Sequence, residues 1–382
     1  MTTIKNKNIA YHQTTLSENE RAAVLNLLNS GHLDAGGIYS QQCTEWLKAL
    51  TQSKLVLLTH SCTAALEMSA ILADIQPGDE VIMPSFTFVS TATAFVMRGA
   101  VPVFVDMNPM TLNIDADQIA AAVTNKTKAI VPMHYAAMAC DMAVINDIAG
   151  MHNLLVIEDA AQCVMASYQG KALGTFGAMG AYSFHFTKNL TSGLGGALLI
   201  NDERFIDRAK IVWQKGTNRE AFIEGKVDKY TWVDQGSSYM MNELGAAFLW
   251  GQMQSSAKIQ SDRMAVWQKY HDFLQPLEVE GHLRRPIVPD GCIHNAHIYY
   301  VLANTVDSAT GLIRHLRSVG IDADRHYVPL HLSPAAKHYG RQSGNLKVSE
   351  TLSRCLVRLP LWPGMFSEVE RIVESIGHYF AR

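Results

Sequence analysis

Short apolar segments alternate with helical patterns along the first 200 residues of the chain. The apolar segments lie at 55–58, 80–83, 101–105, 129–133, 154–157, 181–186 and 197–200, and the helical patterns lie at 63–73, 91–97, 116–123 and 142–151. Continuous apolar strands that alternate with helices are typical of a mostly parallel sheet with helices on both faces. The spacing therefore predicts an α/β fold built on one large sheet.

The alternation ends near residue 250, where a different pattern begins. A long helical stretch at 244–270 precedes short mixed elements at 297–302, 309–319 and 326–330. The chain has 382 residues, which is enough for two domains with hydrophobic cores. We expect a large α/β domain at 1–250 and a smaller C-terminal α+β domain at 251–382.

Near the start, Ser17 and Glu20 have the spacing of a capping box and predict the beginning of a helix.

The composition argues against several classes of protein. Hydrophobic residues make up 48% of the chain, the formal net charge is −3, and no basic run interleaved with aromatics indicates a nucleic-acid interface. The longest uncharged stretch, at 81–97, is shorter than the ~20 apolar residues of a membrane-spanning helix. The opening of the chain has no apolar signal core, and the 6 cysteines are scattered without a C-x-x-C pair. We expect a cytoplasmic protein with free thiols that binds neither nucleic acid nor membrane.

Motifs of other common enzymes are absent from the sequence. No G-x-G-x-x-G follows an apolar segment, and neither a Walker A pattern nor a G-x-S-x-G elbow occurs. The 15 histidines have no metal-binding spacing, so we expect no metal site.

Polar residues that follow the apolar segments are the candidates for a binding site, because ligands of open α/β sheets bind at the carboxyl ends of the strands. Ser61, Cys62 and Thr63 lie between an expected strand and an expected helix. Free N–H groups and the helix dipole at such a place bind anions such as phosphate. The same three residues could also form a plain helix cap.

An acidic pair and a lysine follow two later apolar segments. A carboxylate at Glu158 or Asp159 could keep a pyridinium nitrogen protonated, or it could cap the next turn. Lys188 precedes a glycine-rich turn and, if enclosed, could form a Schiff base, although most lysines are surface residues. An anion-binding turn, an acid and a lysine in this order are the fixed points of a pyridoxal 5'-phosphate (PLP) site. Phe86 or Phe88 could stack on the cofactor ring or belong to the core.

Several segments together resemble the DegT/DnrJ/EryC1/StrS family of sugar aminotransferases, which are fold-type I PLP enzymes. The matching segments lie at 61–66, 77–91, 158–162 and 183–189, and the similarity covers nearly the whole chain. Further segments at 215–219, 227–232 and 236–239 resemble the dTDP-4-amino-4,6-dideoxygalactose transaminases, which aminate dTDP-4-keto-6-deoxyglucose with L-glutamate. The resemblance implies a transaminase for cell-surface polysaccharides such as lipopolysaccharide O-antigen or enterobacterial common antigen.

The resemblance also implies how the cofactor is held. Lys188 would carry PLP as a Schiff base and shuttle the proton at the substrate Cα. Asp159 would pair with the pyridine nitrogen, Gln162 would lie near the ring hydroxyl, and Phe88 would stack on the ring.

The cofactor phosphate and the substrates would use other positions. The backbone of Cys62 and Thr63, with the hydroxyl of Ser183, would bind the phosphate. The candidates for substrate contacts are His185, Tyr327 and His331. Since this family shares its active sites across a homodimer, we expect residues 215–240 to reach the cofactor of the partner.

The sequence departs from the family pattern in two places. Leu194 stands in the glycine-rich turn where the family usually has Glu, which puts the substrate contacts there in doubt. Met240 stands where Arg or Asn often reaches the phosphate of the partner, and Ser237 or Ser238 could take that role.

Alternatives remain within and beyond this family. A PLP sugar 3-dehydratase would have His in place of Lys188, and a regulator that only senses the sugar nucleotide would not need the intact set of Lys188, Asp159 and Gln162. The sequence leaves open amination at C3 instead of C4, a different nucleotide sugar and the configuration of the product.

Overall fold

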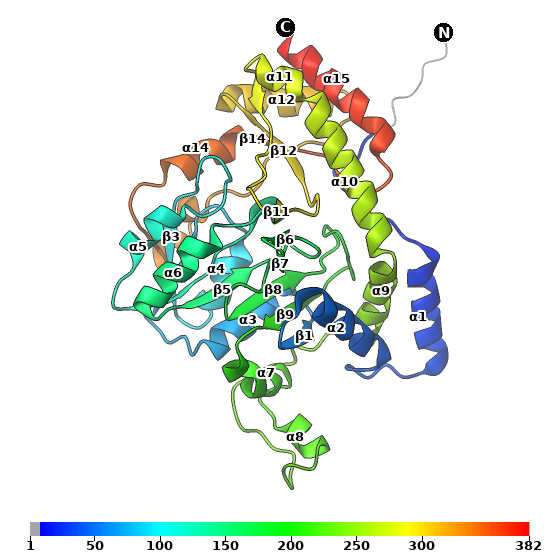
Figure 1. Cartoon of the computed structure of the whole chain (residues 1–382), viewed down its shortest axis with the longest axis vertical. Helices are drawn as coiled ribbons and strands as arrows, with labels where there is room; N and C mark the ends of the chain where they lie inside the picture. Colours follow the sequence, from blue (N-terminus) through cyan, green and yellow to red (C-terminus); the bar gives the residue numbers. More distant parts are fainter. Residues whose placement is uncertain (1–7, 382) are drawn as a thin grey trace.

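The computed structural model describes residues 8–381 and is built around an eight-stranded sheet with the order β1-β9-β8-β5-β4-β2-β3-β13 (Figure 1). Its strands are β1 (Leu55–Thr59), β2 (Glu80–Pro84), β3 (Val101–Val105), β4 (Thr127–Ile130), β5 (Leu155–Asp159), β8 (Met179–Ser183), β9 (Gly196–Ile200) and β13 (Arg341–Gln342). Strand β9 is antiparallel to both of its neighbours, and all other neighbouring pairs are parallel. The predicted α/β fold with a mostly parallel sheet is confirmed.

Helices cover both faces of this sheet. Successive residues of a strand point to opposite faces, and in these strands the residues on both faces are apolar. On β2, Val81 and Met83 pack in one hydrophobic cluster, which includes side chains of α3 (Cys62–Leu72), α4 (Val89–Val96) and α7 (Ile206–Trp213). Ile82, between them, packs in a second cluster on the opposite face. The helices on that face are α2 (Ile38–Thr51), α5 (Ile119–Ala122), α6 (Met142–His152) and α9 (Glu243–Gln254).

The first helix, α1 (Glu18–Ser30), begins at the predicted capping box and packs against α9. The Ser17 N–H donates to the Glu20 carboxylate at 2.7 Å, and the Ser17 hydroxyl accepts from the Asn19 N–H at 3.2 Å. The single helix predicted at 244–270 is wrong, because the chain breaks at Ser255 into α9 and α10 (Ser256–Phe273). The Ser255 hydroxyl accepts a hydrogen bond from the Asn19 side chain at 3.0 Å, so the break is held by the start of α1.

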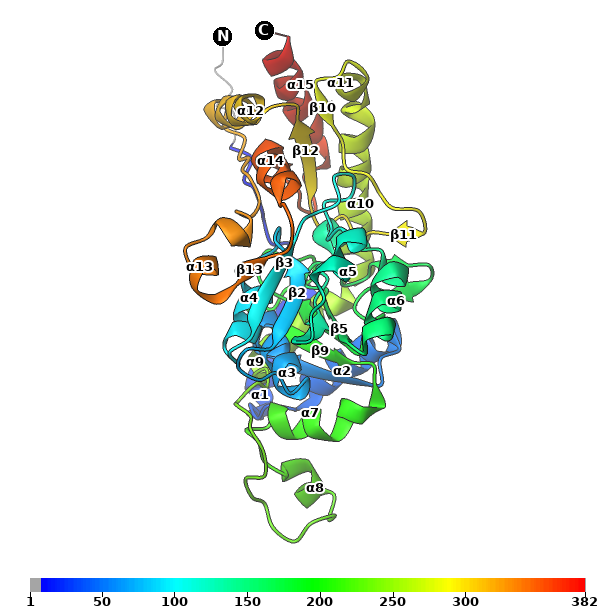
Figure 2. The ribbon, with the colours of Figure 1, turned by 90° about the vertical axis from the view of Figure 1, so that its left-hand side faces the viewer.

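The smaller C-terminal part contains an antiparallel sheet of β10 (Leu283–Arg284), β12 (Tyr299–Ala303) and β14 (Leu356–Leu359). Helices α12 (Val306–Ser318), α14 (Lys347–Cys355) and α15 (Val369–Phe380) lie around it with α10 (Figure 2). The segment at 326–330, which was expected as one of the short elements, is a loop that leads into a 3-10 turn, Leu330–Leu332.

Other short elements complete the chain. They are the helices α8 (Arg219–Ile223), α11 (Gln275–Val279) and α13 (Ala336–Tyr339), the 3-10 turns Ala116–Gln118, Tyr135–Ala137, Glu203–Phe205 and Phe366–Glu368, and the strands β6 (Ser167–Tyr168), β7 (Lys171–Ala172) and β11 (Cys292–Ile293). Strand β13 lies late in the sequence and joins the large sheet beside β3, which ties the two parts of the chain together.

The boundary between 250 and 251 stays our proposal for the two domains. This position falls within α9, and the packing partners change four residues later, at Ser255: α9 packs against α1 and α2, whereas α10 packs against α15. Across residues 8–381, none of the helices has both the length and the apolar character that crossing a bilayer requires. Within the same range no cluster of three or more His, Cys, Asp or Glu side chains is placed to bind a metal ion.

A buried histidine is expected to make the stability of the protein depend on pH. The His294 ring is 4.3 Å from the Trp267 ring, and its Nδ1 accepts a hydrogen bond from the Ala296 N–H at 3.1 Å. Burial lowers the pKa of His294 from 6.5 to about 4. The unfolded chain therefore takes up a proton at a higher pH than the native protein, so this contribution to stability is complete above pH 6.5 and is lost toward pH 4.

Between neutral pH and about pH 4, the free energy of unfolding of the wild type should fall further than that of His294→Gln. We expect the difference between the two losses to be about 3 kcal/mol. Urea unfolding of the wild type and the variant at about pH 7 and about pH 4.5 measures it, because the wild type should lose more stability between the two conditions. Equal losses in the two proteins would contradict the prediction.

Candidate active site

A cavity of about 390 Å³ lies where the carboxyl ends of β1, β5 and β8 face strand β14 of the C-terminal part. Its size falls in the ordinary range of small-molecule sites. Most of the residues that the sequence singled out line it together, namely Cys62, Thr63, Phe88, Asp159, Gln162, Ser183, His185, Lys188 and Tyr327. Their roles remain predictions, but the fold brings them to one place.

One end of the cavity is formed by the start of α3. The Ser61 hydroxyl caps the helix by accepting a hydrogen bond from the Ala64 N–H at 3.0 Å. The backbone N–H groups of Cys62 and Thr63 belong to the first turn, where no intrahelical partner exists, and both residues line the cavity. The Ser183 hydroxyl lines the same cavity from the end of β8. These groups fit the phosphate of PLP, because they are hydrogen-bond donors at the positive end of a helix dipole.

Gly196 allows β9 to pass close to the start of α3. A Cβ atom at this position would overlap the backbone nitrogen of Cys62 and the carbonyl of Ser61. Only glycine avoids this overlap, so the shape of the turn at the start of α3 depends on it.

We expect Gly196→Ala to raise the dissociation constant of PLP by about tenfold or more, because the new methyl group displaces the turn. Titration of the apoprotein with PLP, followed by absorbance, measures the change. Gly150→Ala is the control and should leave PLP affinity unchanged, because Gly150 is exposed on α6 and an added Cβ there meets no atom within 4 Å. Equal PLP affinity in Gly196→Ala and the wild type would contradict this assignment.

Asp159 ends β5 with its carboxylate fixed in the cavity. One oxygen accepts from the Thr91 hydroxyl at 2.7 Å, and the other accepts from the Ala161 N–H at 3.1 Å. Both donors are neutral, and the side chain is only 4% exposed. A buried carboxylate held by neutral donors fits a cationic partner such as a protonated pyridine nitrogen. Thr91 is a positioning residue that sequence reasoning missed, and its place in the hydroxyl-rich segment at 85–91 was the available signal.

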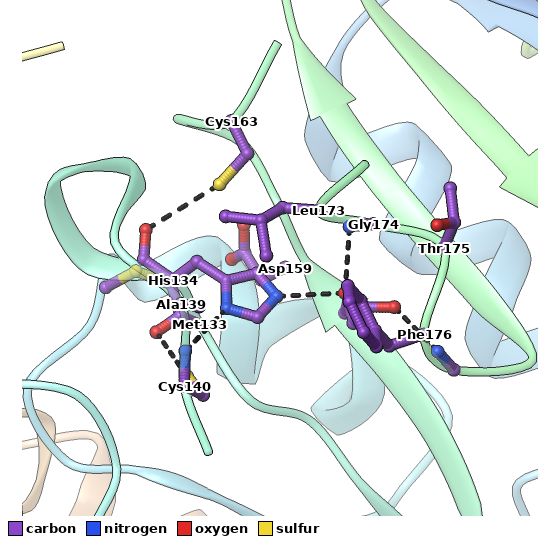
Figure 3. A network of polar contacts seen from close by, with 12 residues as sticks. Met133, His134, Ala139, Cys140, Asp159, Cys163, Leu173, Gly174, Thr175 and Phe176 are labelled. Atoms are coloured by element: carbon purple, nitrogen blue, oxygen red, sulfur yellow. Dashed lines mark hydrogen bonds and ion pairs between the residues drawn. The ribbon is translucent and has the colours of Figure 1, made fainter. Parts of the chain in front are cut away.

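A buried network holds the backbone on either side of Asp159 (Figure 3). Glu158 accepts hydrogen bonds from the His134 Nε2 at 2.9 Å, the Gly174 N–H at 2.8 Å and the Gly177 N–H at 2.6 Å. The Nδ1 of His134 accepts from the Cys140 N–H at 3.1 Å, so the ring proton lies on Nε2. The two members of the acidic pair therefore have different surroundings. Asp159 lines the cavity, whereas Glu158 anchors the loops behind it.

Lys188 lies in the loop after β8 and lines the cavity. Burial lowers the pKa of its amine, while the negative charge of Asp159 opposes part of this shift. A lowered pKa leaves a larger share of the amine unprotonated, as a nucleophile or proton carrier requires.

Gln162 and Tyr327 form a polar wall of the cavity. The Gln162 amide oxygen accepts from the Ala136 N–H at 2.7 Å, and its amide nitrogen donates to the Tyr327 hydroxyl at 3.1 Å. The Phe88 ring lies 6.0 Å from the Tyr327 ring and is 53% exposed. An exposed aromatic face at this place fits stacking on a cofactor ring.

Two further sequence candidates lie outside this arrangement. His331 does not line the cavity, because its Nδ1 is bonded to the Ser85 hydroxyl at 2.6 Å and its Nε2 to Glu350 at 3.2 Å. Met240 pairs with the end of β1 and also lies outside the lining, whereas Leu194 lines the cavity with an exposed side chain.

Sequence reasoning missed a group of lining residues that come from distant parts of the chain. They are Tyr11, His12, His297 and Arg358. For Arg358 a signal existed, because it is the one charged residue in the apolar stretch 356–361. For the others, nothing in the local sequence distinguishes them from surface residues.

Comparisons with known proteins agree with this geometry. A family model described as the DegT/DnrJ/EryC1/StrS aminotransferase family matches residues 14–377. The spore coat polysaccharide biosynthesis protein SpsC of Bacillus subtilis (strain 168) is 31% identical over 381 residues, which cover 97% of each chain.

Solved structures share the fold. The aminotransferase TlmJ from Streptoalloteichus hindustanus is 29% identical with a TM-score of 0.88, over 98% of this chain and 99% of that one. A protein of Streptococcus pneumoniae solved in its PLP form is 23% identical, with a TM-score of 0.89 over 98% of both chains.

Proposed function

The chain belongs to the DegT/DnrJ/EryC1/StrS aminotransferase family, and from this premise we propose that it transfers an amino group from L-glutamate to a nucleotide-linked 4-keto-6-deoxy sugar. It is a PLP-dependent enzyme of the sugar aminotransferase class. The observation that carries the proposal is the single cavity that combines Lys188, the fixed carboxylate of Asp159 and the anion-binding start of α3.

We assign the proton chemistry to Lys188 and Asp159. When bound, PLP supplies an electron sink for negative charge that develops at the Cα of the amino donor. The Lys188 Nζ holds the cofactor at rest and, as a free amine, moves the proton to and from Cα. Asp159 keeps a proton on the ring nitrogen, and Thr91 orients the Asp159 carboxylate for that contact.

The remaining residues of the proposed site bind and orient. The N–H groups of Cys62 and Thr63 and the Ser183 hydroxyl hold the phosphate, which fixes one end of the cofactor. Phe88 and Gln162 also line the cavity, where Phe88 would cover the ring and Gln162 would lie beside the ring hydroxyl.

The sugar proposed as substrate is dTDP-4-keto-6-deoxyglucose, and the proposed product is dTDP-4-amino-4,6-dideoxygalactose. The segments at 215–239 support this choice through their resemblance to transaminases of that kind. The likeness to a polysaccharide biosynthesis protein supports a role in making cell-surface polysaccharide. His185 and Tyr327, which line the cavity, are the proposed neighbours of the sugar.

We further propose a homodimer in which residues 215–240 reach the active site of the partner. The α8 region projects from the body of the protein (Figures 1 and 2). It carries exposed hydrophobic side chains that a partner would cover, namely Phe222, Ile223, Trp232 and Val233. A cytoplasmic location belongs to the same proposal.

One experiment tests the proposed reaction. The PLP-loaded protein is incubated with L-glutamate and dTDP-4-keto-6-deoxyglucose, 2-oxoglutarate is measured, and the C4 configuration of the product is read by NMR. Formation of 2-oxoglutarate together with a 4-amino sugar supports the proposal. Loss of a sugar hydroxyl without a new amine would indicate dehydration, and sugar binding without turnover would indicate a regulator.

A further inference from the structure

Arg358 brings a positive charge to the cavity without a protein partner for it. It lies on β14 and lines the cavity, and its buried Nε has no hydrogen-bond partner among residues 8–381. Asp324 pairs with Arg358 through the backbone, but the Asp324 carboxylate is bonded to Arg317 at 2.8 Å. The guanidinium of Arg358 lies 4.6 Å from the centre of the Tyr11 ring, which orients it without neutralising it.

The histidines of the cavity do not supply a competing positive charge. Burial lowers the pKa of His12 to about 4 and lowers the pKa of His185. Burial also holds the pKa values of His297 and His326 well below the usual range. These rings are therefore neutral at neutral pH. Since Lys188 holds the cofactor, Arg358 is the cation that the described lining offers to a substrate.

The amino donor carries a negatively charged α-carboxylate, which needs a positively charged partner in the cavity. Its α-carboxylate is bonded directly to the Cα on which Lys188 acts, so it enters the same enclosed space. A carboxylate removed from water requires charged hydrogen-bond donors, and the planar fork of an arginine matches its two oxygens. Arg358 and Lys188 both line this cavity, and the charge of Arg358 adds to the effect of burial in lowering the pKa of Lys188.

We propose that Arg358 binds the α-carboxylate of the amino donor and so selects amino acids over amines that lack this group. The proposal rests on the proposed function, since it names the residue that recognises the donor. The cofactor phosphate has separate donors at the start of α3 and does not need this arginine.

The pyrophosphate of the nucleotide sugar is the competing ligand. Arg358 also borders a second hollow, which is lined by Tyr11, Arg317, Asp322, Ala323, Asp324 and Arg325. The arginines there are already engaged, since Arg317 is paired with Asp324 and Arg325 donates to the Thr310 hydroxyl at 2.6 Å. A pyrophosphate in this hollow would meet both acidic side chains, so the donor carboxylate is the better partner.

The test compares Arg358→Gln and Arg358→Lys with the wild type as PLP-loaded proteins. The probe is 2-methyl-L-glutamate, which has no hydrogen on Cα and therefore binds without being transaminated. Calorimetry should show that Arg358→Gln raises its dissociation constant by about 10- to 100-fold, because a charged hydrogen-bonded pair is lost. Arg358→Lys keeps the charge without the fork and should show a smaller increase.

Two measurements distinguish the loss of a carboxylate contact from a general change in the structure of the active site. The dissociation constant of dTDP and the PLP content should be unchanged in both variants. Arg354→Gln is the matched control, because Arg354 is an exposed arginine four positions away that does not line the cavity. It should bind 2-methyl-L-glutamate as the wild type does.

Unchanged binding of 2-methyl-L-glutamate together with weaker binding of dTDP would overturn the proposal and assign Arg358 to the pyrophosphate. If Arg358→Gln does not fold, Arg358→Lys decides by the same two dissociation constants. A wild type that binds 2-methyl-L-glutamate through Arg358 but aminates no keto-sugar would refute the proposed function and leave this inference standing.

Discussion

Replacing Lys188 with alanine is expected to lower kcat by about 10⁴-fold or more, because one substitution removes both the tether of the cofactor and the base that moves the Cα proton. The side chain lines the cavity with a lowered pKa, and no other lysine lines it within residues 8–381. Formation of 2-oxoglutarate from L-glutamate and the keto-sugar measures the loss. The visible absorbance of the PLP-loaded protein should change at the same time.

Two further variants test whether the loss of turnover is due to the missing amine of Lys188. Lys188→Arg restores the positive charge without a nucleophilic amine and should be as inactive as Lys188→Ala. Lys171→Ala removes an exposed lysine on β7, outside the cavity, and should keep normal turnover. Normal turnover in Lys188→Ala would refute the assignment of the proton shuttle.

Glu158→Gln is expected to lower the free energy of unfolding by about 3 kcal/mol or more. The carboxylate accepts from His134, Gly174 and Gly177, and neither it nor the His134 side chain is exposed to solvent (0% each). A glutamine amide would replace one acceptor oxygen with an N–H₂ group that faces a donor, so at least one buried N–H would lose its partner. Urea unfolding at neutral pH measures the change.

The chain offers a matched control for this prediction. Glu350 is also bonded to a histidine, His331, at 3.2 Å, but its side chain is 46% exposed. Glu350→Gln should therefore cost at most about 1 kcal/mol. Similar losses in the two variants would mean that burial does not determine the strength of the His134–Glu158 contact.

Much of the large sheet could be predicted because the sequence pattern of each strand involves only neighbouring residues. Each strand from β1 to β5 is a short apolar run beside a helical pattern, and continuous apolar character follows from burial on both faces. The antiparallel direction of β9 carries no such signal, since a strand buried on both faces reads the same in either direction. The break at Ser255 was missed because it depends on a hydrogen bond from Asn19, far away in the sequence.

Some residues of the candidate site could be identified from the sequence, whereas others could be judged only from the structure. The start of α3, Asp159 and Lys188 could be chosen from the sequence because each lies at the end of a strand or in the loop after it, and the ends of such strands meet at one edge of the sheet. His331 was chosen through the family resemblance, but it lies in a 3-10 turn with a buried side chain, and Ser85 and Glu350 occupy its ring nitrogens. Only the packed structure shows which way a loop side chain points.

By itself, the sequence determined the fold class and the order of the turn at the start of α3, the acid and the lysine, since hydrophobic periodicity and strand-end positions are properties of neighbouring residues. The tertiary structure alone decided which of two adjacent acids faces the cavity, and it brought Arg358 of β14, whose Nε has no hydrogen-bond partner among residues 8–381, to the same cavity as Lys188. These features depend on contacts between segments far apart in the chain, and a side chain acquires its partners and its charge state only when those segments pack together.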